Sequence, residues 1–177
     1  MAIPVIRGRL PGPGQKEFLE FQQYDSGRAD QAAAKLGSGA EEPWLEVINQ
    51  HEPSALPAID RLLSDAAILT RIRGRVIDVG AGTCLLSARL SQLPAVESVY
   101  ALDLSERFLT STGIRVARHF GVMESKLTFV ASDCNDIPLE IGTLDAAFIF
   151  AAIHHGIRRA RRQALALSAE EIGRAHV

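Results

Sequence analysis

The pattern of apolar positions indicates alternating strands and helices in the part of the chain that follows Gly74. Four short apolar runs are expected to be strands buried on both faces: residues 76–79, 98–104, 127–131 and 144–151. The first two gaps between these runs carry apolar residues at helical spacing, most clearly over residues 106–120. Strands that alternate with helices predict a parallel sheet with right-handed crossovers. The fold class is therefore expected to be α/β, with a doubly wound sheet.

Two further segments precede this sheet. Residues 1–14 hold three prolines and three glycines, which favour a flexible arm without regular structure. Residues 15–72 are expected to form an N-terminal helical cap. Its clearest helix covers residues 55–69, where Leu56, Ile59 and Leu63 recur at helical spacing and Ser54 is placed to be the N-cap. The sheet domain is then expected to cover residues 73–170.

Composition and charge restrict the function. A chain of 177 residues has room for one core, and its formal net charge of −2 gives no overall electrostatic reason to bind nucleic acid or an anionic membrane. No window approaches the roughly 18 apolar residues that span a bilayer, and the N-terminus lacks a secretory signal. Two cysteines are too few for a disulfide framework, so reduced thiols and a cytoplasmic location are expected. The sequence does not indicate an oligomeric state.

Candidate chemistry gathers where the predicted strands end. In a Rossmann-like sheet with about four strands in the order 3-2-1-4, ligands bind outside the carboxyl ends of the strands, near the point where the strand order reverses. Four groups fall at these ends: the glycine turn 78–84, Asp103, the acidic turn 132–134 and the segment 148–155. Taken singly, the glycine turn is also compatible with a tight connection, and Asp103 with a helix N-cap. Their occurrence in order at consecutive strand ends favours a ligand site.

With these four groups, residues 75–155 resemble the class I S-adenosylmethionine (SAM)-dependent methyltransferases, particularly small-molecule enzymes of the ubiquinone-biosynthesis type. The resemblance implies SAM as cofactor and a small-molecule acceptor as substrate. It also implies that the turn formed by Asp78, Gly80, Ala81 and Gly82 binds the methionine moiety and that Asp103 binds the ribose. Leu104, Asp133 and Cys134 would surround the adenine, and Ala151 would lie near the sulfonium.

One position departs from the family pattern. Many members carry a third glycine where this chain has Cys84. We expect the cysteine to be tolerated if the following helix has already begun there, although it would narrow the site.

The main alternative is a protein that binds a nicotinamide dinucleotide. Its fingerprint, Gly-x-Gly-x-x-Gly, would require glycine where this chain has Leu85, and Asp133 has no evident role in a dinucleotide site. A noncatalytic SAM-binding module is a second alternative.

Catalytic residues are harder to assign. His154 is a weak candidate for a general base, but its position is equally compatible with the rim of the site, because methyl transfer from a sulfonium depends mainly on positioning. His154 and His155 are adjacent and would point to opposite sides of an extended chain, so they do not suggest a metal site.

The end of the chain is expected to be incomplete relative to this family. A fifth strand, a further helix and an antiparallel pair would normally follow the helix expected near residues 157–167, and the sequence has no segment for them. Residues 171–177 correspond to the translation of a common sequencing-adapter DNA, so we interpret them as a non-native tail. The segment 73–170 is therefore expected to be a partial methyltransferase domain, which leaves open whether the fragment is active by itself.

Overall fold

The structure is a computed structural model that describes residues 2–9, 54–134, 136–140 and 142–150. The predictions for Ala151, His154, the tail 171–177 and most of the cap lie outside the described residues. The described elements, in chain order, are β1 (Val5–Arg7), α3 (Ala55–Ser64), α4 (Ala66–Leu69), β2 (Gly74–Val79), α5 (Leu85–Ser91), β3 (Val96–Asp103), α6 (Glu106–Phe108), the π-helical η2 (Leu109–Gly113), α7 (Ile114–His119), the 3₁₀ turn η3 (Glu124–Lys126), β4 (Leu127–Ala131) and β5 (Ala146–Phe148).

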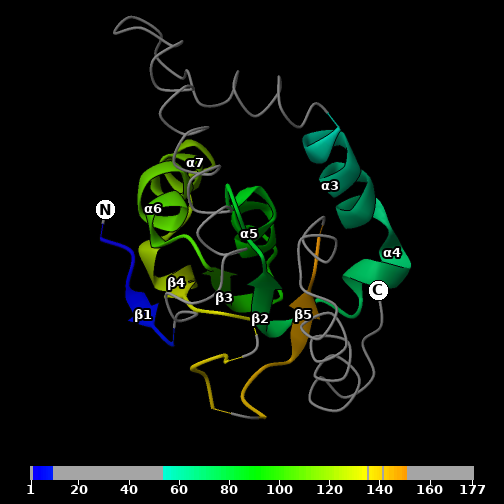
Figure 1. Cartoon of the computed structure of the whole chain (residues 1–177). Coiled ribbons are helices and arrows are strands. Elements are labelled where there is room, and N and C mark those ends of the chain that lie inside the picture. Colours follow the sequence, from blue (N-terminus) through cyan, green and yellow to red (C-terminus); the bar gives the residue numbers. More distant parts are fainter. Residues whose placement is uncertain (1, 10–53, 135, 141, 151–177) are drawn as a thin grey trace, which may run out of the picture.

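The described strands form one five-stranded parallel sheet in the order β1-β4-β3-β2-β5. Figure 1 shows β1 and β5 at its two edges. The four strands predicted from the sequence are β2, β3, β4 and β5, and their order 3-2-1-4 is confirmed. The central strand pair is in register from Arg75 opposite Ser98 to Val79 opposite Leu102. Both strands therefore end beside each other, which brings the residues after Val79 next to those after Leu102.

The prediction of about four strands was one short, because part of the arm 1–14 is a strand. Val5–Arg7 pairs in parallel with Phe129–Ala131 at the edge of the sheet. Proline before an edge strand is tolerated, since its missing N–H does not have to join a ladder. The carbonyl of Pro4 instead accepts a hydrogen bond of 2.9 Å from the Phe129 N–H. The prolines and glycines of the arm therefore bound a short strand and do not exclude one.

The described helices pack on one face of the sheet. Their buried side chains share one hydrophobic cluster with the sheet residues Val76, Val99 and Phe129, and the helical members include Ile59, Leu86, Leu90, Leu109 and Val116. In Figure 1, α3 and α4 lie on the β5 side of the molecule, and α6 and α7 lie on the β1 side. No helix within the described ranges is long and apolar enough to cross a membrane.

The helices predicted over residues 55–69, in the gap after the first predicted strand and over residues 106–120 all form, with local differences. The helix expected over 55–69 is divided at Asp65, whose carboxylate accepts hydrogen bonds from the N–H groups of Ala67 and Ile68 and so starts α4. Ser54 is the N-cap residue of α3, but its side chain makes no capping hydrogen bond. The helix expected over 106–120 contains the π-helical stretch η2 between α6 and α7.

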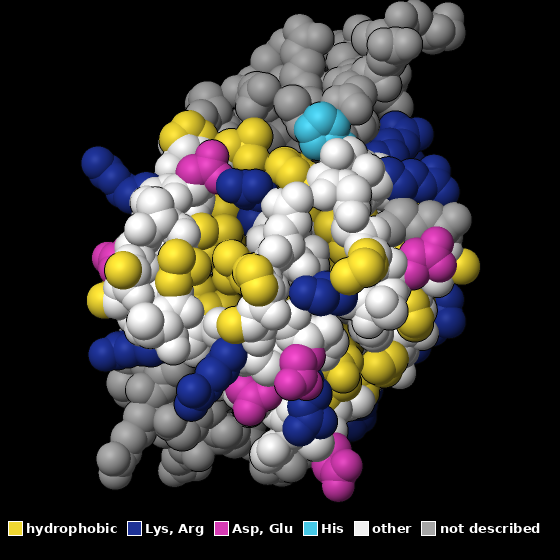
Figure 2. Space-filling view, turned by 180° about the vertical axis from the view of Figure 1, so that it is seen from behind, with side chains coloured by type: hydrophobic (Ala, Val, Ile, Leu, Met, Phe, Trp, Pro, Cys, Tyr) yellow, Lys and Arg dark blue, Asp and Glu magenta, His cyan; other side chains and the backbone are white. Residues whose placement is uncertain are grey.

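The opposite face of the sheet carries a second cluster, built from Ile77, Val79, Leu102 and Val130. Loop residues that follow β4 pack against it: Ile137, Leu139 and Leu144. Because the described helices contribute to the first cluster only, helices on both faces of the sheet remain a prediction. Figure 2 shows that acidic and basic side chains alternate along the lower part of the rear surface, so the described residues there carry no large field of one sign.

Candidate cofactor site at the carboxyl ends of the strands

A glycine turn follows β2 and is fastened to the end of the neighbouring strand. The N–H groups of Gly80 and Ala81 donate to the Leu102 carbonyl at 2.8 and 2.9 Å. The Gly82 N–H donates to Oδ2 of Asp103 at 2.9 Å. Three successive amides of the turn therefore point toward β3, which fixes the turn directly beside Asp103.

Gly82 leaves open space above this turn. A Cβ atom built on it would meet no heavy atom nearer than the Gly80 carbonyl oxygen at 4.0 Å, and the residue has a φ of +50°. Glycine suits such a left-handed backbone, and the missing side chain lets another molecule approach the main chain closely. The main chain of the turn is therefore accessible on the side of Gly82.

Cys84 is the point at which the turn differs from expectation. Helix α5 begins at Leu85, and Cys84 is its N-cap residue with a left-handed φ of 63°. The condition that the helix has already begun at Cys84 is therefore not met, and the cysteine is accommodated as one more left-handed residue before the helix starts. The thiol is fully buried in the core, and burial raises its pKa well above the ordinary value. Its Sγ lies 3.7 Å from the Gly82 carbonyl oxygen.

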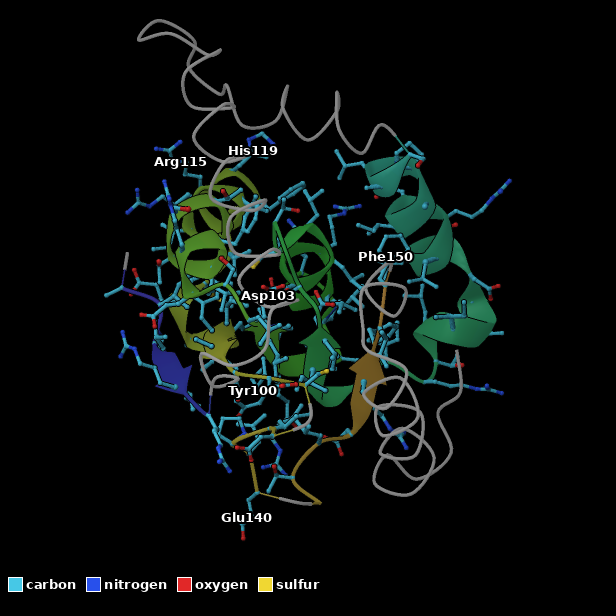
Figure 3. All side chains as sticks on the ribbon, in the orientation of Figure 1. Tyr100, Asp103, Arg115, His119, Glu140 and Phe150 are labelled. Atoms are coloured by element: carbon cyan, nitrogen blue, oxygen red, sulfur yellow. The ribbon has the colours of Figure 1, made fainter. Side chains whose placement is uncertain are left out.

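Asp103 occupies the centre of the site. Its Oδ1 accepts from the Ser105 N–H at 2.8 Å, while Oδ2 accepts from Gly82, and the residue is 8% exposed. Burial raises the pKa of this carboxyl group, and the two backbone donors oppose that rise. An ionised carboxylate has about four lone-pair sites, so each oxygen keeps capacity for another donor. In Figure 3 Asp103 lies near the middle of the molecule, Tyr100 of the same strand lies below it, and Phe150 beyond β5 lies slightly above it and to the right.

Asp78 lies beneath the turn. It is 2% exposed, and the Ser87 hydroxyl donates to its Oδ2 at 2.6 Å. Burial is the main reason that the pKa of Asp78 is raised to about 6, and the nearby Asp103 adds to the rise while Ser87 opposes it. This carboxyl group therefore ties the end of β2 to helix α5 from inside the fold.

The acidic turn after β4 completes the edge. The Ser132 N–H donates to the Asp103 carbonyl at 3.1 Å, and the Ser132 hydroxyl donates to the Asp136 carbonyl at 2.6 Å. Asp133 and Cys134 are half-buried in this turn, and Leu104 is half-buried at the end of β3. Burial first, and then the Asp133 carboxylate, raise the pKa of Cys134 to about 11. A thiol of that pKa is protonated at neutral pH, which disfavours a role as nucleophile.

The structure therefore brings most of the predicted site residues to one edge. Asp103 joins the glycine turn on one side through Gly82 and the acidic turn on the other through Ser132. Ser87 and Ser105 were not among the predicted residues. Ser105 had a readable signal, because it stands directly before helix α6 and its hydroxyl accepts from the Phe108 N–H as an N-cap. Ser87 had none, since serine inside a helix is common.

Comparison with known proteins identifies the family of the chain. The methyltransferase-domain family profile matches residues 76–171. Over 89 residues the chain is 32% identical to the ubiquinone/menaquinone biosynthesis C-methyltransferases UbiE of Citrifermentans bemidjiense and of Geobacter sp. strain M21. The matched part is 49% of this chain and 36% of each relative, so the chain spans about a third of their length.

Solved structures share the fold at low identity. The magnesium protoporphyrin IX methyltransferase of Synechocystis PCC 6803, crystallised with bound SAM, is 18% identical with a TM-score of 0.60, over 92% of this chain and 75% of that one. A SAM-dependent methyltransferase structure from Methanococcus maripaludis is 18% identical with a TM-score of 0.53, over 72% of this chain and 55% of that one. These structures show the fold, and the family profile, which matches more than half of the chain, shows that the chain belongs to the class I SAM-dependent methyltransferase-domain family.

Proposed function

We propose that the chain binds S-adenosylmethionine at this edge and forms the cofactor-binding part of an enzyme that methylates a small molecule. The observation that carries the proposal is the position of Asp103, a buried carboxylate that connects the glycine turn to the acidic turn while keeping lone pairs for further donors. Family membership supports the same interpretation. The nicotinamide alternative lacks comparable support, because Leu85 is buried at the first position of α5, where that fingerprint has glycine.

The residues fit the cofactor in two respects. The open space beside Gly82 gives a ligand access to the backbone of the turn, where we place the methionine moiety with Asp78, Gly80 and Ala81 forming and supporting the turn. The free lone pairs of Asp103 suit the two hydroxyl groups of a ribose.

We assign the adenine to the side of Leu104, Asp133 and Cys134, where half-buried apolar surface lies beside an acid that can accept from an exocyclic amine. Ala151 near the sulfonium and His154 as a base, both outside the described residues, remain proposals from the sequence.

The chain's contribution is to bind and orient the cofactor. When bound, SAM would supply an electrophilic methyl group on its sulfonium; a nucleophile of the acceptor would bond to that methyl carbon while the carbon–sulfur bond breaks and the thioether leaves in line. In this proposal the site residues hold the cofactor through the remaining lone pairs of the Asp103 carboxylate and the open main chain at Gly82, and such fixed groups lower the entropy that the reaction must lose. The free state of Cys84 and Cys134 supports a reducing compartment, and we place the protein in the cytoplasm.

Methyl transfer is tested by release of S-adenosylhomocysteine from SAM, measured by mass spectrometry. Quinone precursors and magnesium porphyrins are suitable acceptors, because two relatives are named for such compounds. We expect cofactor binding, and turnover with an acceptor of small-molecule size. Binding of SAM without release of S-adenosylhomocysteine for any acceptor, in a protein extended to the full length of its relatives, would favour a noncatalytic module.

A further inference from the structure

The N-terminal segment 4–9, here named the N-terminal clasp, is bonded along the outer edge of β4 and onto the acidic turn. The Phe129 N–H donates to the Pro4 carbonyl at 2.9 Å, and the Gly8 N–H donates to the Ala131 carbonyl at 3.0 Å. Beyond the strand, the Asp133 N–H donates to the Arg9 carbonyl at 3.3 Å. The backbone of Asp133 is therefore held by a segment more than a hundred residues earlier in the chain.

Gly8 makes this contact close. A Cβ atom at this position would lie 2.2 Å from Oγ and 2.8 Å from Cβ of Ser132, and 2.9 Å from Cγ of Pro138. Such separations are well inside van der Waals contact, so any larger residue would displace either the clasp or the turn. Ser132 is also fully buried, and its hydroxyl donates to the Asp136 carbonyl. The absence of a side chain at Gly8 thus lets the clasp reach the backbone of the acidic turn.

A second attachment leads from the clasp to the start of α6. The guanidinium of Arg7 pairs with Glu106, with Nε 3.1 and 3.0 Å from the two carboxylate oxygens and Nη2 at 2.5 Å from Oε1. Glu106 follows Ser105, whose N–H binds Asp103. Both side chains are exposed, and exposed ion pairs contribute little to stability, so this pair is a weak second link between the clasp and α6.

We propose that the N-terminal clasp is a positioning element that sets the adenine side of the cofactor site by holding the backbone N–H of Asp133 and the side chain of Ser132. The inference rests on the proposed function, since it assumes that this turn contacts the cofactor. Gly8 and Arg9 touch only the back of the turn, so they are positioning residues and not ligands. In this proposal the clasp restricts the backbone of the acidic turn to one conformation and so keeps its contacts with the cofactor in place.

The test compares Gly8→Ala with a matched glycine variant. Gly121→Ala also introduces a Cβ, at a φ of +64°, but with nothing within 4 Å of it, so it strains the backbone without moving the acidic turn. Titration with S-adenosylhomocysteine should show about tenfold weaker binding for Gly8→Ala, the loss expected for one misplaced hydrogen bond to the adenine, and unchanged affinity for Gly121→Ala. Gly8→Ala combined with Ser132→Gly removes the two closest contacts and leaves only Cγ of Pro138, 2.9 Å from the new Cβ. The double variant should therefore recover most of the affinity of Ser132→Gly alone.

A readout in the wild-type chain does not depend on any variant folding. Amide hydrogen exchange should slow at Gly8 and Asp133 when S-adenosylhomocysteine saturates the site, because a cofactor held by the acidic turn also stabilises the hydrogen bonds behind it. Wild-type affinity in Gly8→Ala, or protection from exchange confined to the glycine turn, would refute the positioning role of the clasp and leave the proposed function standing. A wild-type chain that is folded but binds no S-adenosylhomocysteine would instead refute the proposed function and, with it, the role of the clasp.

Discussion

Replacing Gly113 by alanine is expected to destabilise the protein, although the residue lies in a helical segment with a φ of −56° that alanine adopts readily. The reason is Cys84. A Cβ atom on Gly113 would lie 2.8 Å from the Cys84 Sγ and 3.3 Å from two ring atoms of Phe129. Both Cys84 and Phe129 are fully buried, so neither can move aside into solvent. The sulfur of Cys84 therefore occupies the space that a side chain at position 113 would need.

The magnitude follows from opposing terms. Overpacking a core typically costs about 1–3 kcal/mol, and replacing glycine by alanine in a helix gains about 1 kcal/mol, so Gly113→Ala should lower the free energy of unfolding by about 0–2 kcal/mol. Cys84→Ala should cost about 1–2 kcal/mol through loss of the buried sulfur and the small cavity left behind. In the double variant the new methyl group fills the space of the sulfur. The two losses should then not add, and we expect a coupling free energy of about 2 kcal/mol.

The assay is urea unfolding of the wild type, both single variants and the double variant, followed by circular dichroism. The four proteins should share one slope of the free energy of unfolding against urea concentration. Stability of the double variant within about 0.5 kcal/mol of the wild type would agree with the packing described for Cys84 and Gly113. Simple additivity of the two single losses within that margin would refute it, since it would mean that the two side-chain positions do not share one space.

Two further predictions concern the carboxylates of Asp78, which is buried, and Asp145, which is exposed. The folded-state pKa of Asp78 is raised from 3.8 to about 6, so the folded protein binds this proton more tightly and its stability falls as the pH rises from about 4 to 6, by about 3 kcal/mol. Asp78→Asn should remove that component, so the stability difference between variant and wild type should change over this window in denaturation at several pH values; a constant difference would contradict the burial of the charge. Gly74→Ala should lower the free energy of unfolding by about 2–4 kcal/mol. Gly74 has a φ of +67°, and a Cβ atom on it would lie 2.2 Å from Oδ2 of Asp145, which accepts a hydrogen bond of 2.7 Å from the Arg75 N–H. In an Asp145→Ala background the same change should cost about 1–2 kcal/mol, the backbone strain alone, and an equal loss in both backgrounds would speak against the clash.

The central strands and the position of the site were predictable from the sequence because their signals are local. Apolar runs ended by glycine or acid identify buried strands, and the carboxyl ends of adjacent parallel strands meet at one edge. Asp103 and Gly82 could therefore be expected together before the hydrogen bond between them was known. Strand order followed from the rules of parallel α/β folds.

The features that were missed depend on contacts far apart in the chain. The strand Val5–Arg7 receives its hydrogen bonds from β4, and its short sequence has no pattern that separates it from an irregular arm. The left-handed backbone of Cys84 is imposed by the glycine turn before it, against the preference of a residue with a Cβ. Asp78 pairs with Ser87 only because α5 packs over the end of β2, so the partner could not be chosen from sequence alone.

Calorimetric titration of the wild-type chain with S-adenosylhomocysteine tests the central claim most directly, with Asp103→Asn and Asp60→Asn as paired variants. The substitution at Asp103 keeps the shape of the side chain but replaces one acceptor oxygen by a donor, whereas Asp60 is an exposed acid that pairs with Arg89 away from the site. The account predicts one binding site in the wild type, at least about tenfold weaker binding in Asp103→Asn and unchanged binding in Asp60→Asn. A folded wild-type chain that binds no S-adenosylhomocysteine, or an Asp103→Asn variant that binds as tightly as the wild type, would contradict it.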